Sequence, residues 1–129
     1  LKDFEKAIEL DADNVEYKFN LALCMGKLNR PNDSELLFLS IIETDPTHSG
    51  AYFNLGNLKY KLGQYNNAIS YYTLAYHHNT GNLSILYNKG LPTHKIGQTE
   101  KACEDMNKVM IDDSRLAEDF YSRHCQEIE

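Results

Sequence analysis

A repeat of 34 residues restricts the fold of this chain more than any other feature of its sequence. Residues 15–48 align with residues 49–82 without a gap, and the same register continues through residues 83–116. Each unit carries an aromatic residue followed by asparagine at the same place, and these pairs are Phe19-Asn20, Phe53-Asn54 and Tyr87-Asn88. Such self-similarity predicts an array in which each repeat packs against its neighbours in the chain.

Each unit is predicted to form two helices joined by a short turn. Apolar residues recur at steps of three and four, which is the spacing of one helix face, and turn residues interrupt them at regular places. The turns within units are expected at 29–32, 63–64 and 97–98, and those between units at 45–46 and 80–82. The chain is therefore expected to be all-α.

This two-helix unit resembles the tetratricopeptide repeat (TPR), and the second unit matches the pattern of that family most closely. Small residues at the crossing of the two helices let the backbones approach, while large residues fill the space around it. In the second unit these positions hold Tyr52, Leu55, Gly56, Ala68, Tyr72 and Ala75. The resemblance implies an α-solenoid, a right-handed superhelix of stacked antiparallel hairpins.

The two ends of the chain continue the register only in part. Residues 1–14 match the second helix of a truncated leading repeat. Its core positions would be Phe4, Ala7, Ile8 and Leu10. The chain begins at Leu1 rather than Met, so we expect it to be a piece of a longer array. Residues 117–129 are predicted to form either a capping helix with a polar outer face or the start of a fourth repeat.

Pro92 departs from the pattern because it falls inside the predicted first helix of the third unit. Proline has no backbone N–H to donate, and its ring clashes with the carbonyl of the residue four positions earlier, which is Asn88. We therefore expect a kink near Pro92, seen as a bend or a split between Asn88 and Pro92.

The candidate functional surface is the face of the first helices that lies opposite their packing face. At about 100° per residue, unit positions 2, 5, 6, 9, 12 and 13 share this face, and the resemblance to TPR proteins implies that it lines a concave groove. Leu23 and Gly26 fall on it together with the candidate binding residues. These are Phe19, Asn20, Lys27, Phe53, Asn54, Asn57, Tyr60, Lys61, Tyr87, Asn88, His94 and Lys95.

Three ladders recur on this face at the repeat spacing. They are an amide ladder (Asn20, Asn54, Asn88), an aromatic ladder (Phe19, Phe53, Tyr87) and a lysine ladder (Lys27, Lys61, Lys95). An asparagine side chain offers both donors and an acceptor, so the amide ladder is predicted to bind an extended peptide backbone, as some TPR proteins do. Simpler roles stay open: asparagines that face water, rings that pack between hairpins, and lysines that end helices.

Several other functions are not supported by the sequence. The TPR variant that grips the C-terminal carboxylates of heat-shock chaperones needs cations, but at its positions this chain keeps only the central asparagine, Asn54. No phosphate-binding glycine loop, metal-binding histidine pair or nucleophile elbow occurs, so no catalytic residue, metal or cofactor is predicted. A formal charge of −6 argues against nucleic-acid binding. No apolar stretch is long enough to span a membrane.

The cysteines bear on the compartment. Cys24, Cys103 and Cys125 are odd in number, lie far apart and form no Cys-x-x-Cys pair. Neither a disulfide framework nor a zinc site is therefore expected, and a reducing, cytoplasmic compartment fits best.

Together these features predict a non-catalytic scaffold that binds a protein or peptide partner in its groove. Two alternatives stay open. The chain could be the regulatory or substrate-docking arm of a larger multidomain enzyme. It could also be an architectural module in which two copies associate through the exposed N-terminal half-repeat to give a homodimer.

Overall fold

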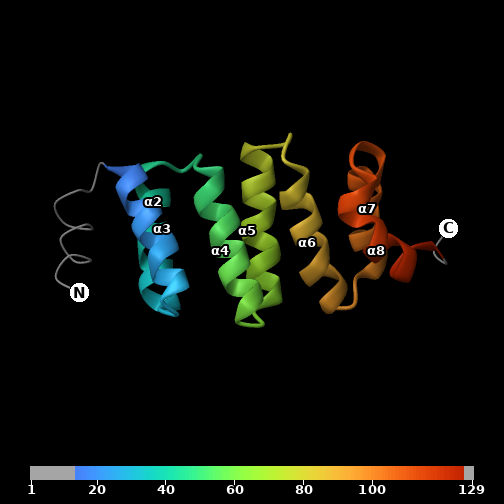
Figure 1. Cartoon of the computed structure of the whole chain (residues 1–129), viewed down its shortest axis with the longest axis horizontal. Coiled ribbons are helices and arrows are strands. Elements are labelled where there is room, and N and C mark those ends of the chain that lie inside the picture. The colour runs from blue at the N-terminus through green and yellow to red at the C-terminus, as the bar shows by residue number, and fades with distance from the viewer. Residues whose placement is uncertain (1–13, 127–129) are drawn as a thin grey trace.

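The computed structural model describes residues 14–126, and the regular elements in this range are seven α-helices. The helices stand in a row in chain order, from α2 beside the N-terminal end to α8 beside the C-terminal end (Figure 1). Their bounds are α2 Val15–Lys27, α3 Pro31–Thr44, α4 Ser49–Lys61, α5 Tyr65–His78, α6 Leu83–Lys95, α7 Thr99–Asp112 and α8 Ser114–His124. The predicted all-α fold of antiparallel hairpins is confirmed.

The turns inside the hairpins explain why the helices end where they do. One residue in each turn has a left-handed conformation: Asn29 (φ 58°), Gly63 (φ 76°) and Gly97 (φ 88°). Glycine and asparagine adopt this conformation most readily, and it lets the following N–H return to a carbonyl of the helix. The N–H of Gln64, for example, donates to the carbonyl of Lys59 at 2.9 Å. The three turns thus follow the repeat spacing.

The second hairpin shows the close helix crossing that its small residues predict. A Cβ atom on Gly56 of α4 would lie 2.6 Å from the ring of Tyr72 on α5, so this position admits only glycine without rearrangement. Ala68 and Ala75 of α5 are fully buried, and Tyr72 is 1% exposed. The α4–α5 pair is therefore held by one large ring packed against small residues.

The first hairpin reaches the same packing with polar substitutions. Lys18 of α2 stands where the second unit has Tyr52, yet its side chain is buried and its Nζ donates to Ser40 Oγ at 2.5 Å. Ser34 replaces the small Ala68, and its hydroxyl donates to the carbonyl of Ala22 at 2.9 Å. Each polar group is hydrogen-bonded, so these exchanges do not leave an unpaired group in the core.

Pro92 does not split α6, which runs as one helix from Leu83 to Lys95. The proline is buried near the C-terminal end of the helix, where it removes one backbone hydrogen bond, the one that the Asn88 carbonyl would accept. Thr93 Oγ1 donates to the carbonyl of Lys89 at 2.7 Å in the same turn. The expected split between Asn88 and Pro92 is therefore wrong. The expected bend near Pro92 stays a prediction.

The last helix begins earlier than the repeat predicts. Only Asp113 separates α7 from α8, whereas four residues separate α3 from α4 and α5 from α6. The boundary expected at Ala117 therefore lies inside α8, whose start is Ser114. Ala117 and Phe120 of α8 are buried against the third hairpin. Of the predicted leading half-repeat, residues 1–14, all but Asn14 lie outside the described residues.

The cysteine pairing contradicts the sequence expectation. Cys103 of α7 and Cys125 after α8 form a disulfide, with their Cα atoms 5.5 Å apart, while Cys24 is free and exposed. The two half-cystines lie 10 and 12 residues from Asp113, on opposite sides of the turn, so the antiparallel pairing of α7 and α8 brings them together. The sequence pattern did not predict this disulfide because the two cysteines are 22 residues apart and meet only when α7 and α8 pack against each other.

No helix among residues 14–126 is long and apolar enough to cross a membrane.

Candidate functional site

The predicted groove residues all lie on α2, α4 and α6, but the structure does not treat them alike. Lys27, Asn54, Asn57 and Lys61 line one hollow between the first and second hairpins. The others lie outside that hollow, and several are engaged in packing or hydrogen bonds.

The hollow, called here the α2–α4 hollow, has a volume of about 530 Å³. Its lining residues come from α2, α3, α4 and the turns that follow α2 and α4, and are Ala22, Leu23, Gly26, Lys27, Asn29, Pro31, Ser34, Phe38, Asn54, Asn57, Leu58, Lys61 and Leu62. Most of this lining is apolar, with the two asparagines and two lysines as its polar groups on the groove face. A concave apolar site with a few polar groups is the usual form of a ligand site.

Gly26 explains why the hollow lies in the first unit. The same unit position holds Tyr60 in the second hairpin and His94 in the third. Tyr60 packs against Tyr65 with ring centroids 5.5 Å apart, and burial raises the pKa of Tyr60. A Cβ on Gly26 would meet only Ser34 Oγ, at 3.9 Å. The space that a large side chain fills elsewhere is therefore open here.

The amide ladder is partly used by internal hydrogen bonds. Asn54 Nδ2 donates to the carbonyl of Gly50 at 2.8 Å, and Asn88 Nδ2 donates to Asn57 Oδ1 at 3.1 Å. Asn20 is exposed. Each of these amides has further capacity, because a carboxamide offers two donors and an oxygen with two lone pairs. The internal bonds orient the Asn54 and Asn88 amides.

Asn57 is the centre of a network that links three helices. Its Oδ1 accepts from Asn88 of α6 and from the hydroxyl of Tyr72 of α5, the latter at 2.5 Å. Burial of Tyr72 raises the pKa of its phenol far above the ordinary value, so the hydroxyl stays protonated and acts as a donor at neutral pH. The network fixes the Asn57 side chain at the wall of the α2–α4 hollow.

The aromatic ladder takes part in packing within the hairpins. Phe19 contacts Phe38 edge-on with ring centroids 5.8 Å apart, and Phe53 contacts Tyr72 at the same distance. Tyr87 packs against the core of the third hairpin. Each ring is only partly buried, so one part of it packs and the rest faces the groove.

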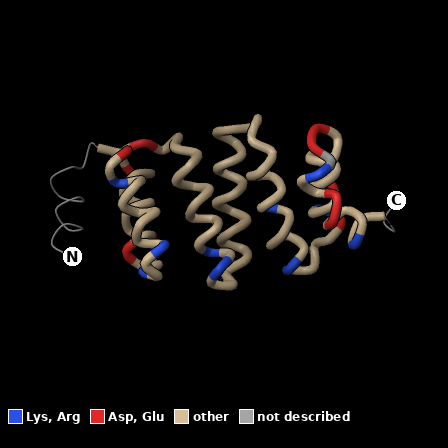
Figure 2. The backbone as a smooth tube through the Cα atoms, in the orientation of Figure 1, with Lys and Arg blue, Asp and Glu red and all other residues tan. Residues whose placement is uncertain are grey.

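The lysine ladder is exposed and lies in the last turns of α2, α4 and α6. Figure 2 shows basic segments, drawn in blue, at the lower ends of these helices. Among the described residues, Lys27, Lys61 and Lys95 form no recorded ion pair, in contrast to Lys59, whose Nζ lies 2.8 Å from Glu35. A cation at a helix C-terminus is favoured by the helix dipole, and it stays available to a ligand as well.

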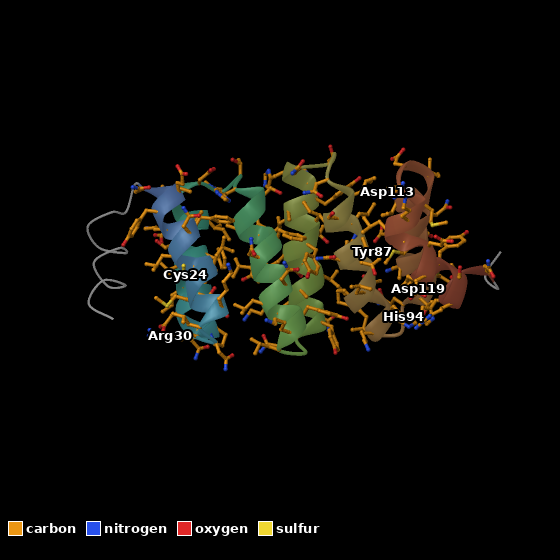
Figure 3. The ribbon with its side chains drawn as sticks, viewed as in Figure 1. Cys24, Arg30, Tyr87, His94, Asp113 and Asp119 are labelled. Carbon is orange, nitrogen blue, oxygen red and sulfur yellow. A yellow bond between two sulfur atoms is a disulfide. The ribbon has the colours of Figure 1, made fainter. Side chains whose placement is uncertain are left out.

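His94, one of the predicted groove residues, is engaged in contacts with α7 and α8. It lies at the lower end of α6 (Figure 3), with its ring 4.1 Å from that of His124 and 5.3 Å from that of Phe120, between centroids. Its Nδ1 lies 3.0 Å from Thr99 Oγ1. Desolvation, followed by the His124 and Lys95 charges, lowers the pKa of His94. This histidine therefore supports the docking of α8.

We expect acidification to weaken this docking. The pKa of His94 in the folded chain lies below 6.5, so as the pH falls through this region the unfolded chain binds more protons and stability is lost, whereas above about pH 6.5 it is retained. Thermal unfolding at about pH 7.5 and about pH 5.5 should show a smaller loss for His94→Gln than for the unaltered chain. His77→Gln, which removes an exposed histidine of α5, is the control. An equal loss in all three would contradict this role.

The fold and the groove define a helical-hairpin repeat protein of the α-solenoid class. The family model for the tetratricopeptide repeat matches residues 37–70, from the middle of the first hairpin to the middle of the second. Residues 37–70 thus match the tetratricopeptide repeat, and the hairpins on either side have the same period and architecture.

Similar solved structures have the same fold. A MamA crystal structure shares 25% identity over 86% of this chain and 65% of that chain, with a TM-score of 0.78. A second MamA structure shares 26% identity over 84% and 60%, with a TM-score of 0.75. The structure of YrrB, a TPR protein with an unusual peptide-binding site, shares 21% identity over 88% and 60%, with a TM-score of 0.75. The chain thus spans less than two thirds of each of these two MamA chains.

Two parts of the site were missed by sequence reasoning. The Tyr72–Asn57–Asn88 network joins residues from three helices and has no local signal. The α2–α4 hollow did have a signal in the sequence, because Gly26 occupies the unit position at which the other two repeats have the large residues Tyr60 and His94. Comparing side-chain volume at equivalent positions would have located it.

Proposed function

We propose that this chain is a non-catalytic protein-binding module that holds an extended peptide segment across α2, α4 and α6. TPR proteins typically mediate protein–protein interactions, and the similar protein YrrB has an unusual peptide-binding site. The observation that carries the proposal is the α2–α4 hollow, in which two asparagines and two lysines of the groove face surround an apolar interior.

The amides suit a peptide main chain because a backbone presents alternating N–H and C=O groups at regular spacing. A carboxamide can satisfy either group, so recognition by Asn20, Asn54 and Asn88 depends little on peptide sequence. The internal bonds of Asn54 and Asn88 hold two of these amides in place, which lowers the entropy lost when a ligand binds.

A peptide selected from a displayed random library on the intact chain tests the proposal. We expect the triple variant Asn20→Ala, Asn54→Ala, Asn88→Ala to bind it at least about tenfold more weakly, because each lost hydrogen bond contributes about 0.5–1.5 kcal/mol. Fluorescence anisotropy measures the dissociation constants, and circular dichroism confirms the helical content.

The matched control removes three exposed asparagines from the second helices instead. Asn32→Ala, Asn66→Ala and Asn107→Ala lie on α3, α5 and α7 and should leave the affinity unchanged. If the groove variant binds as tightly as the unaltered chain, the amide ladder does not bind the ligand.

A further inference from the structure

We infer that the α2–α4 hollow is a specificity subsite for a large apolar side chain that lies next to a carboxylate in the peptide. The inference rests on the proposed function, since the hollow would select among peptides that the groove holds. Three independent features of the hollow carry it: open space, apolar walls and unpaired positive charge at one edge.

The space comes from a single residue. Because Gly26 has no side chain, the lower part of the groove between α2 and α4 stays unfilled, and the nearest atom to a Cβ there is Ser34 Oγ at 3.9 Å. At the equivalent position of the second hairpin, Tyr60 packs against Tyr65. In the first hairpin, an aromatic or branched side chain of a ligand can therefore occupy the space that the Tyr60 side chain fills in the second hairpin.

The walls favour an apolar group. Leu23 of α2, Leu58 of α4 and Leu62 beyond α4 contribute to one lining with Ala22 and Phe38. Leu62 is 47% exposed and Leu23 is 36% exposed, although both are large hydrophobic residues. Covering them with an apolar ligand side chain removes this surface from water, which favours binding.

The charge selects the neighbouring group. Lys27 and Lys61 line the hollow, and no aspartate or glutamate of the described residues 14–126 does, although the whole chain carries a formal charge of −6. A smaller hollow of about 310 Å³ beside α6 and α7 shows the contrast. It contains Lys89 and Lys101, but Glu104 and Asp105 line it as well, and Lys89 is paired with Asp105 at 3.5 Å. The positive charge of the α2–α4 hollow is therefore free to attract a carboxylate.

The probe is an acetylated and amidated octapeptide of serine and alanine with a central phenylalanine–glutamate pair. We expect it to shift the amide resonances of Gly26, Leu58 and Leu62 in the ¹⁵N-labelled chain. Replacing its phenylalanine by alanine should weaken binding about tenfold or more, and replacing its glutamate by glutamine about threefold.

Gly26→Tyr tests the space without threatening the fold, because tyrosine is the natural residue at this position of the second hairpin and a non-glycine residue favours the helix. The variant should lose the resonance shifts at Leu58 and Leu62. Lys27→Gln with Lys61→Gln should abolish the preference for glutamate over glutamine. Lys101→Gln with Lys108→Gln, two exposed lysines of α7, is the charge-matched control and should retain that preference.

The outcomes separate the subsite from the proposed function. The subsite is wrong if the octapeptide causes no shifts at the hollow, or if the phenylalanine and alanine peptides bind equally. In either case a library-selected peptide that still depends on the amide ladder leaves the proposed function standing. If that selected peptide is also insensitive to the amide ladder, the groove-binding proposal fails as well.

Discussion

Gly56→Ala is expected to lower the free energy of unfolding by about 1–3 kcal/mol, although alanine is the better helix former. The added Cβ would lie 2.6 Å from two carbons of the Tyr72 ring. That ring cannot move aside easily because it is 1% exposed and its hydroxyl is bonded to Asn57. The clash therefore outweighs the gain of up to about 1 kcal/mol in helix propensity.

Gly90→Ala is the matched control at the same position of the third hairpin. Its Cβ would meet Met106 Cε at 2.4 Å, but this atom is the end of a flexible side chain that can change rotamer. We expect a change within about 0.5–1 kcal/mol of the unaltered chain. Urea unfolding followed by circular dichroism measures both variants. Equal losses would mean that the Tyr72 ring does not fix the α4–α5 crossing.

Breaking the Cys103–Cys125 disulfide is expected to cost about 3 kcal/mol, the loss of loop-closure entropy for a loop of this length. Both half-cystines are nearly buried, and the bond ties the end of α8 to α7. Without it, α8 should open before the rest of the array, because a terminal helix contacts only its neighbours.

Cys103→Ser with Cys125→Ser, and the unaltered chain treated with a dithiol reductant, should both show this loss in urea unfolding. Hydrogen exchange should rise first in Ser114–His124. Cys24→Ser, which removes the exposed free thiol, should behave like the unaltered chain. If reduction leaves both stability and exchange unchanged, the disulfide does not hold α8.

The hairpins were predictable because their determinants are local and periodic. Asn29, Gly63 and Gly97 mark the same turn three times, and each apolar face repeats with them. The start of α8 was not predictable in this way, since the array changes its turn length at Asp113. The sequence predicts a bend or a split of the helix at Pro92. Near the C-terminal end of α6, however, this proline removes only one backbone hydrogen bond and the helix continues to Lys95.

The site was predictable as a face but not as a cavity. Periodicity placed Asn54, Asn57 and Lys61 on one side of α4, and the structure brings them beside Lys27. It could not show that Asn57 bridges Tyr72 and Asn88, because hydrogen bonds between repeats depend on how the hairpins stack. The disulfide was not predicted for the same reason, because the Cys103–Cys125 pair forms only when α7 and α8 pack antiparallel to each other.

The most direct test of peptide binding across α2, α4 and α6 uses the library-selected peptide with a nitroxide spin label at one end. Paramagnetic broadening in the ¹⁵N-labelled chain reports which amides lie near the label. We expect strong broadening at groove positions of the first helices, such as Asn20, Asn54 and Asn88, and little at Leu39 of α3 or Thr73 of α5, which are exposed on the second helices. Broadening centred on α3, α5 and α7, with none on the groove face, would contradict it.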